Sequence, residues 1–295
     1  MAGASMKDIR LRIKSVSSTM QITKAMQLVA SSKLRKAQKE IESIRPYEKA
    51  LDSILADVAG ASSLSCKLES RNPDAPVAVV AVASNNSLCG GFNVNIIKQA
   101  LETLGGIGSV ELYSIGRKMS EALKKAGYKP VFESSELIGS PRFDKSEKLA
   151  KRLISAFMNG EYSRVILVYN SFVSASSQKP VVEQYLPFSI SAEKPVAEED
   201  DEIWDADADR RRHKFLFEPS PDEIAEGLIP QLLDLKFHAA LLDSSAAEQA
   251  ARTIAMQTAT DNAEHLLADL TLEYNKGRQQ KITAEILDLV AGSAE

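Results

Sequence analysis

Residues 19–33, TMQITKAMQLVASSK, are typical of helix throughout, yet the helix they form has no polar face. The larger apolar side chains point in nearly every direction around a helical wheel; they are Met20, Ile22, Met26, Leu28 and Val29. A helix on the surface of a globular protein buries one stripe and exposes the opposite face to water. We therefore expect this helix to be contacted from several sides.

The segment extends in both directions as a heptad pattern. Alternating steps of four and three residues meet apolar side chains except at three positions, Thr23, Gln27 and Glu48. The series is Ile9, Ile13, Val16, Met20, Thr23, Gln27, Ala30, Leu34, Ala37, Ile41, Ile44, Glu48, Leu51, Leu55 and Val58. A pattern sustained for so long predicts a coiled-coil helix over residues 1–60, roughly 75–80 Å long. Pro46 should kink it, because proline removes a backbone donor.

A second heptad segment occupies residues 220–291. SPDE at 220–223 is a helix start signal, with Ser as N-cap, Pro in the first turn and Glu three residues on. The apolar series is Leu228, Leu232, Leu235, Ala239, Leu242, Ala246, Gln249, Thr253, Met256, Thr260, Ala263, Leu267, Leu270, Tyr274 and Gly277. After Gly277 the apolar face shifts to Ile282, Ile286 and Leu289, so the register slips there. This helix would approach about 100 Å, with a possible kink at Pro230.

Two long heptad helices at opposite ends of one chain are expected to pair with each other. The middle of the second, SSAAEQAARTIAMQTATDNA, is rich in small residues, which let two backbones approach closely. A single compact domain between the helices favours an antiparallel pair, because both attachment points then lie on one side.

The middle of the chain, residues 76–190, predicts an α/β domain with a largely parallel, Rossmann-like sheet. PVAVVAVAS at 76–84 is a continuous apolar run typical of a buried strand. The expected order after it is helix, strand, helix with Gly127 as its stop, helix, strand and strand. The corresponding segments are FNVNIIKQALETL, SVELYSIG, RKMSEALKKAG, DKSEKLAKRLISAFMNG, SRVILVYNSF and PVVEQYLPFS. Strands alternating with helices indicate this fold class.

Residues 191–219 form a charged connection. Between Glu193 and Lys214, nine acidic residues are followed by Arg210, Arg211 and Arg212. We expect an exposed, mobile loop here, with a regulatory tail as the alternative.

A search for catalytic chemistry finds no self-contained active site. ASNNSLCGGFN at 83–93 lies between a strand and a helix, where phosphate loops occur, but lacks both G-x-G-x-x-G and a Lys-Ser/Thr pair. We expect a tight turn that needs glycine. Cys89 has no histidine within this domain to act as a base, and is expected to be a packed thiol. The cysteines and histidines have no zinc spacing, and no cofactor is expected.

Composition excludes further classes. The chain has 295 residues and a formal net charge of −4, which gives no indication of nucleic-acid binding. The first 39 residues, however, carry nine Lys and Arg and one acid, Asp8. This asymmetry indicates an acidic or polar partner, with a solvated basic helix face as the alternative. Two cysteines make no disulfide framework. No apolar run reaches the ~20 residues of a membrane-spanning helix, and we expect no targeting segment.

These motifs resemble the gamma subunit family of F-type ATP synthases. MKDIRLRIKSVSSTMQITKAMQLVASSKLRKAQ is similar to the family's N-terminal helix. EQAARTIAMQTATDNA and YNKGRQQKITAEILDLVAG are similar to its C-terminal helix, and SLCGGFN to its central-domain loop. The resemblance covers essentially the whole chain in order. Two positions depart from it: Asn85, Asn86 and Ser87 replace an acidic-basic pair and Gly, and Ser293 replaces Ala.

The resemblance implies a rotor shaft rather than an enzyme. In this family the coiled coil fills the cavity of a hexamer of alpha and beta subunits, and the globular domain rests on the membrane c-ring with the epsilon subunit. Proton flow turns ring and shaft, which drives ATP synthesis at the beta subunits. The expected location is the cytoplasmic face of the bacterial inner membrane, reached peripherally through partners.

The resemblance also implies contacts with the hexamer. The positions that match family motifs are Lys24, Met26, Arg252, Gln279, Thr283 and Glu285; the basic residues Lys33, Arg35 and Lys36 would face acidic loops of beta. For Met26 the alternative is coiled-coil packing, and for Arg252 a solvated position on its helix. Two other functions stay open from the residues alone: an α/β enzyme with helical oligomerisation arms, and a coiled-coil scaffold protein.

Overall fold

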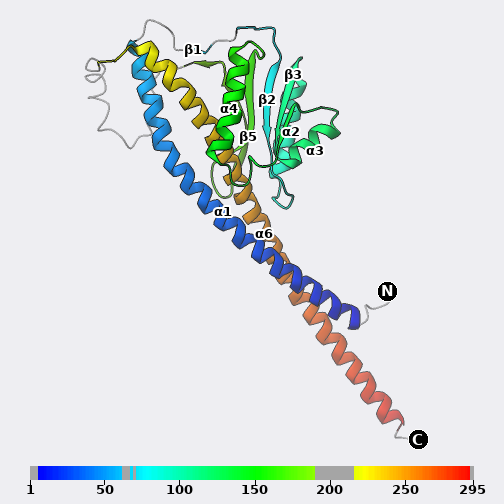
Figure 1. Cartoon of the computed structure of the whole chain (residues 1–295). Helices are drawn as coiled ribbons and strands as arrows, with labels where there is room; N and C mark the ends of the chain where they lie inside the picture. Colours follow the sequence, from blue (N-terminus) through cyan, green and yellow to red (C-terminus); the bar gives the residue numbers. More distant parts are fainter. Residues whose placement is uncertain (1–5, 62–66, 69–70, 190–215, 293–295) are drawn as a thin grey trace.

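A computed structural model describes residues 6–61, 67–68, 71–189 and 216–292. Figure 1 shows two long helices side by side, with an α/β domain against one end of the pair. The first, α1 (Met6–Ala61), is continuous through Pro46, and the second, α6 (Pro221–Gly292), is continuous through Pro230. The predicted charged stretch 193–214 and Ser293 lie outside the described residues, as does Cys66.

The two helices form an antiparallel coiled coil, as predicted. Low residue numbers on α1 meet high numbers on α6: Thr23 hydrogen-bonds Thr260, and Asp52 lies 3.3 Å from the Lys236 ammonium. Every position of both predicted heptad series is buried or half-buried. The heptad prediction is therefore confirmed, and the apolar seam between the helices supplies the burial that stabilises them.

The helices differ in reach. The sulfur of Met6, the first residue of α1, lies beside Gly277 of α6, where an added Cβ would meet it at 3.0 Å. Residues 278–292 therefore extend past the end of α1, and Figure 1 shows this tip projecting alone. At 1.5 Å per residue the projection is about 22 Å. The predicted register slip after Gly277 coincides with the loss of the partner helix.

The α/β domain is built on a five-stranded sheet. The strands are β2 (Val77–Val82), β3 (Val110–Ile115), β4 (Phe132–Ser134), β5 (Arg164–Phe172) and β6 (Gln178–Leu186). Their order is β4-β3-β2-β5-β6, and all neighbours are parallel except the antiparallel pair β5–β6. This is the order of a doubly wound Rossmann-like sheet, which confirms the predicted fold class.

Helices cover both faces of the sheet. Alternate β2 residues Val77, Val79 and Ala81 face α2 (Phe92–Gly105) and α3 (Arg117–Lys125). Ala78, Val80 and Val82 face the opposite way, in one core with α4 (Phe143–Met158) and parts of α1 and α6. Burial on both faces explains why β2 is apolar along its whole length. The base of the coiled coil therefore belongs to the domain core.

Two short strands, β1 (Lys67–Leu68) and β4, escaped the sequence analysis. β1 pairs antiparallel with β7 (Phe188–Ser189), which is the end of the predicted strand segment PVVEQYLPFS, and β4 has only three residues at the edge of the sheet. Segments this short show no periodicity, so only their pairing partners define them.

Candidate partner-binding surface

The middle of α1 exposes apolar side chains although the helix is already paired. The Ala30 side chain packs toward α6 and is only 1% exposed. On the other sides, Ile22 is 60%, Leu28 67% and Val29 56% exposed. Lys24 is exposed beside them, and Met26 is half-buried. Exposed apolar side chains on a helix that is already paired mark a candidate protein-binding surface.

The projecting tip of α6 has the same character. Gln279, Thr283 and Glu285 are exposed, and within the helix Thr283 donates to the carbonyl of Gln279 at 2.9 Å. The apolar residues of the tip are also exposed, at 47% for Ile282, 54% for Ile286, 62% for Leu287 and 74% for Leu289. The tip lies beyond the end of α1, so among the described residues no partner helix covers these side chains.

The basic residues of α1 follow farther along the helix. Lys33, Arg35 and Lys36 are exposed, and Lys36 lies 3.9 Å from the carboxylate of Glu40 with both side chains in solvent. Exposed pairs of this kind contribute little to stability. Their charge is therefore available to an acidic partner.

A groove of about 560 Å³ runs beside this segment. Met26, Val29 and Lys33 of α1 form one wall, and Asn85 and Asn86, in the loop after β2, form another. The remaining lining comes from the segment 138–140 and from Glu248, Gln249 and Arg252 of α6. The structure thus brings three predicted contact residues, Met26, Lys33 and Arg252, to one groove.

The structure describes all nine predicted contact residues, and Arg252 differs from the others because it is buried. Its side chain is 9% exposed and its guanidinium is engaged within the chain. Nη2 donates to Glu248 Oε1 at 2.6 Å, and Nη1 donates to the carbonyl of Ser87 at 2.7 Å. Both acceptors were missed by the sequence analysis. Glu248 lies one turn before Arg252, which is a signal for an ion pair, but Ser87 is distant in the chain.

The loop after β2 lies where Rossmann-like folds bind ligands. In the observed strand order the direction of winding reverses between β2 and β5, and the crevice at their carboxyl ends is the usual ligand site. Here α6 packs there: Cys89 and Phe92 contact Ala247 and Ala251. The coiled coil therefore takes the place that a nucleotide would occupy in a dinucleotide-binding protein.

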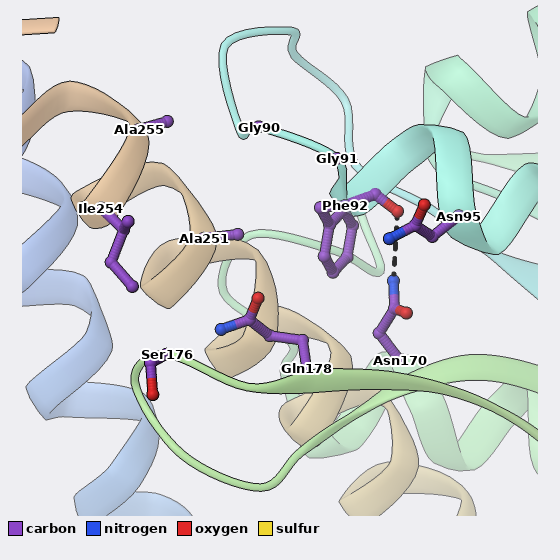
Figure 2. Close-up of a pocket in the computed structure, with 10 residues that line it drawn as sticks. All are labelled: Gly90, Gly91, Phe92, Asn95, Asn170, Ser176, Gln178, Ala251, Ile254 and Ala255. Carbon is purple, nitrogen blue, oxygen red and sulfur yellow. Dashed lines mark hydrogen bonds between the residues drawn. The ribbon is translucent and has the colours of Figure 1, made fainter. Parts of the chain in front are cut away.

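The space remaining at this crevice is a small pocket of about 210 Å³ (Figure 2). None of its lining residues carries a charge, and the Asn170 amide donates to the carbonyl of Phe92 at 3.5 Å. Gly90 has φ +57°, which favours glycine, as predicted for a tight turn. Burial raises the pKa of the Cys89 thiol, and the side chain is 1% exposed. These are properties of a packed thiol, not of a nucleophile.

Comparison with known proteins is unambiguous. A sequence model of the family described as ATP synthase matches residues 5–294. The ATP synthase gamma chain of Bacteroides thetaiotaomicron is 41% identical, covering 99% of this chain and 100% of that one. The gamma chain of Bacteroides fragilis is 42% identical, covering 98% and 99%. The chain belongs to the ATP synthase gamma chain family.

Solved structures show the same fold as this gamma-family chain. A chain of the mitochondrial ATP synthase of Euglena gracilis, in an assembly described as OSCP/F1/c-ring, aligns with TM-score 0.65 at 19% identity. It covers 98% of this chain and 93% of that one. A chain of the Tetrahymena thermophila central stalk/c-ring structure aligns with TM-score 0.54 at 21% identity, covering 81% and 99%.

As a member of this family the chain is a non-catalytic subunit. The part of the chain that the structure describes holds no cluster of three metal-ligating side chains. Among its helices, none combines the length and the apolar character needed to cross a membrane.

Proposed function

We propose that this chain is the rotor shaft of an ATP synthase, transmitting torque between a membrane ring and a catalytic hexamer. The observation that carries this proposal is the apolar surface around the middle of α1 and along the α6 tip. These side chains remain exposed after α1 and α6 have paired. The surface on α1 begins beside the loop of Asn85 and Asn86, and the α6 tip projects beyond the end of α1, away from the α/β domain (Figure 1).

In this proposal the coiled coil enters the cavity between alternating alpha and beta subunits. The shaft is asymmetric about its long axis, because it consists of two different helices along most of its length and of α6 alone at the tip. Rotation then presents different surfaces to three otherwise equivalent catalytic sites and drives them through different affinities for nucleotide. Apolar and singly charged contacts suit such a bearing, since each contact must be released in turn.

The α/β domain would rest on the c-ring together with the epsilon subunit. Proton flow through the membrane sector would turn the ring and the shaft together, and so drive synthesis of ATP. The chain would then sit at the cytoplasmic face of the bacterial inner membrane, associated peripherally through these partners.

The contact residues in this proposal are the exposed and half-buried members of the predicted set. Lys24, Met26, Lys33, Arg35 and Lys36 would meet the beta subunits from α1, and Gln279, Thr283 and Glu285 would meet the hexamer from the α6 tip. Eight of the nine predicted residues are thus exposed or half-buried and open to a partner. Arg252 is treated separately below.

Affinity purification of the tagged chain from its native membranes, followed by mass spectrometry, tests the proposal. We expect alpha and beta subunits in stoichiometric amounts together with ATP hydrolysis. A homodimer without these subunits would support a scaffold, and a small-molecule activity of the isolated chain would support an enzyme. Either result contradicts the shaft function.

A further inference from the structure

The loop of residues 84–91 is held from two sides by arginines. From the domain, Arg117 at the start of α3 donates from Nε and Nη2 to the carbonyl of Asn85, at 3.1 and 2.9 Å. Its backbone N–H also donates to Asn85 Oδ1 at 3.0 Å. From the coiled coil, Arg252 donates to the carbonyl of Ser87 at 2.7 Å. The loop therefore joins the sheet to the shaft through polar contacts as well as through packing.

The loop adopts a conformation that needs such support. Leu88 has φ +66°, in the left-handed region that residues with a Cβ rarely adopt. It follows directly after the carbonyl that Arg252 binds, and its side chain is 61% exposed. A backbone conformation of this kind persists only where surrounding contacts over-determine it.

Beside the loop, the buried carboxylate of Glu248 is paired with Arg252. Glu248 is 4% exposed, and its Oε2 has no hydrogen-bond partner among the described residues. Its Oε1 receives the Arg252 guanidinium. The guanidinium is planar and carries several donors, so it can satisfy the buried carboxylate and the Ser87 carbonyl together.

We infer that Arg252 is a positioning residue, not a residue that touches the hexamer. Through Ser87 it fixes the 84–91 loop on α6 and so sets the wall of Asn85 and Asn86 that faces Met26 and Lys33 across the groove. The shape of the groove, and not the charge of Arg252 itself, is what the partner meets. The part of this inference that concerns coupling between proton pumping and ATP hydrolysis rests on the proposed function.

Two variants in the assembled complex separate positioning from simple stability. Arg252→Met removes both hydrogen bonds and leaves Glu248 buried without its counterion. The double variant Arg252→Met with Glu248→Gln removes that charge but does not restore the bond to Ser87. Thermal unfolding, hydrogen exchange of the 84–92 peptide and the ratio of ATP-driven proton pumping to hydrolysis are measured for both.

We expect the double variant to recover most of the stability lost in the single variant. Exchange of the 84–92 peptide should be about tenfold faster in both variants, and the pumping ratio should be lowered in both. Arg252→Lys, which can reach one acceptor at a time, should be intermediate. Arg35→Met, which removes an exposed arginine of α1, should leave loop exchange unchanged.

Two outcomes overturn the inference. If loop exchange stays at the wild-type rate in Arg252→Met while pumping falls, Arg252 contacts the partner directly. If the double variant restores pumping as well as stability, Arg252 only compensates Glu248. Loop exchange does not depend on coupling, so this arm gives a result even if the shaft function fails in the purification experiment.

Discussion

Asp234 shows how a single buried acid makes stability depend on pH. It lies on α6, is 4% exposed, and its Oδ1 has no hydrogen-bond partner among the described residues. Burial raises the pKa of this carboxyl to about 6, although the nearby Lys151 opposes the shift. The folded chain therefore holds this proton more tightly than the unfolded chain, whose carboxyl titrates near pH 4.

Asp234→Asn should stabilise the chain above pH 6. Because the native pKa is raised, the wild-type contribution of this group is most favourable below about pH 4 and is lost as pH rises through about 6. The amide carries no charge, so this loss disappears, and we expect about 1 kcal/mol of stabilisation at pH 8. Unfolding followed from pH 4 to 8 measures this, with the exposed Asp269→Asn as control. Parallel pH profiles for Asp234→Asn and wild type would contradict the assignment.

Met26→Lys tests the surface of α1. Met26 is half-buried in the groove, where a lysine would place its ammonium toward the surrounding subunits. We expect an added ion pair with acidic residues of beta, which holds the rotor in one orientation and lowers proton pumping relative to ATP hydrolysis. Met26→Leu keeps the volume and should behave as wild type. If Met26→Lys leaves the ratio of proton pumping to ATP hydrolysis unchanged, Met26 does not contact the beta subunit as proposed.

At the scale of elements, the α6 tip is a segment where substitutions should affect assembly with partners and not the folding of the chain. Its apolar side chains lie beyond the end of α1 and are exposed in the chain by itself. Changes there should therefore leave the fold intact and act only on the bound state.

Ile286→Asp should weaken binding to the alpha–beta hexamer by tenfold or more, because a carboxylate would replace a buried apolar contact. The unfolding temperature of the isolated chain should not change, since Ile286 is 54% exposed. Titration of the hexamer with wild-type and variant chains measures the affinity. Lys276→Gln, at an exposed position of α6 before the tip, serves as control. Equal affinities would mean that the tip does not enter an apolar sleeve.

The seam of the coiled coil contains polar pairs that match across the two helices. Thr23 lies opposite Thr260, with 2.8 Å between their hydroxyl oxygens, and the Gln27 amide donates to Gln257. Two of the three polar exceptions in the α1 heptad, Thr23 and Gln27, are thus satisfied by residues of α6. Polar pairs at seam positions favour one register over its neighbours, because a shifted register would leave these groups unpaired.

For the whole molecule, this pairing predicts that α1 and α6 turn as one body. A disulfide formed by Thr23→Cys with Thr260→Cys should therefore leave proton pumping and ATP hydrolysis at wild-type levels. Activity is measured before and after oxidation, and again after reduction. Reversible loss of activity on oxidation would show that the helices twist or slide against each other during rotation.

The domain and the coiled coil also share one core. Leu51 and Leu55 of α1, and Leu232 and Phe237 of α6, pack in the same cluster as β2 and α4. The helix pair is thus anchored at its base by the sheet and is free at its tip (Figure 1). This arrangement suits the transmission of torque from the domain to the tip.

The sequence by itself determined the two long helices, their pairing and the longer strands of the sheet. Heptad spacing is a local property of each helix, and it identified the seam positions of both helices, including Ala30 and Leu242, because side chains three and four apart share a face. The all-apolar run of β2 likewise reports burial on both faces of a sheet. Motif resemblance identified the family, which the comparisons then established.

Only the tertiary structure decided how distant residues meet. The sequence analysis proposed Arg252 as a contact with the hexamer but gave no indication that its guanidinium binds Ser87, which lies far away in the chain. It also left the polar residues Thr23 and Gln27 at heptad core positions unexplained, because their partners lie on the other helix. The physical reason is common to both: a hydrogen bond between distant segments depends on how those segments are packed together, and no local periodicity records that packing.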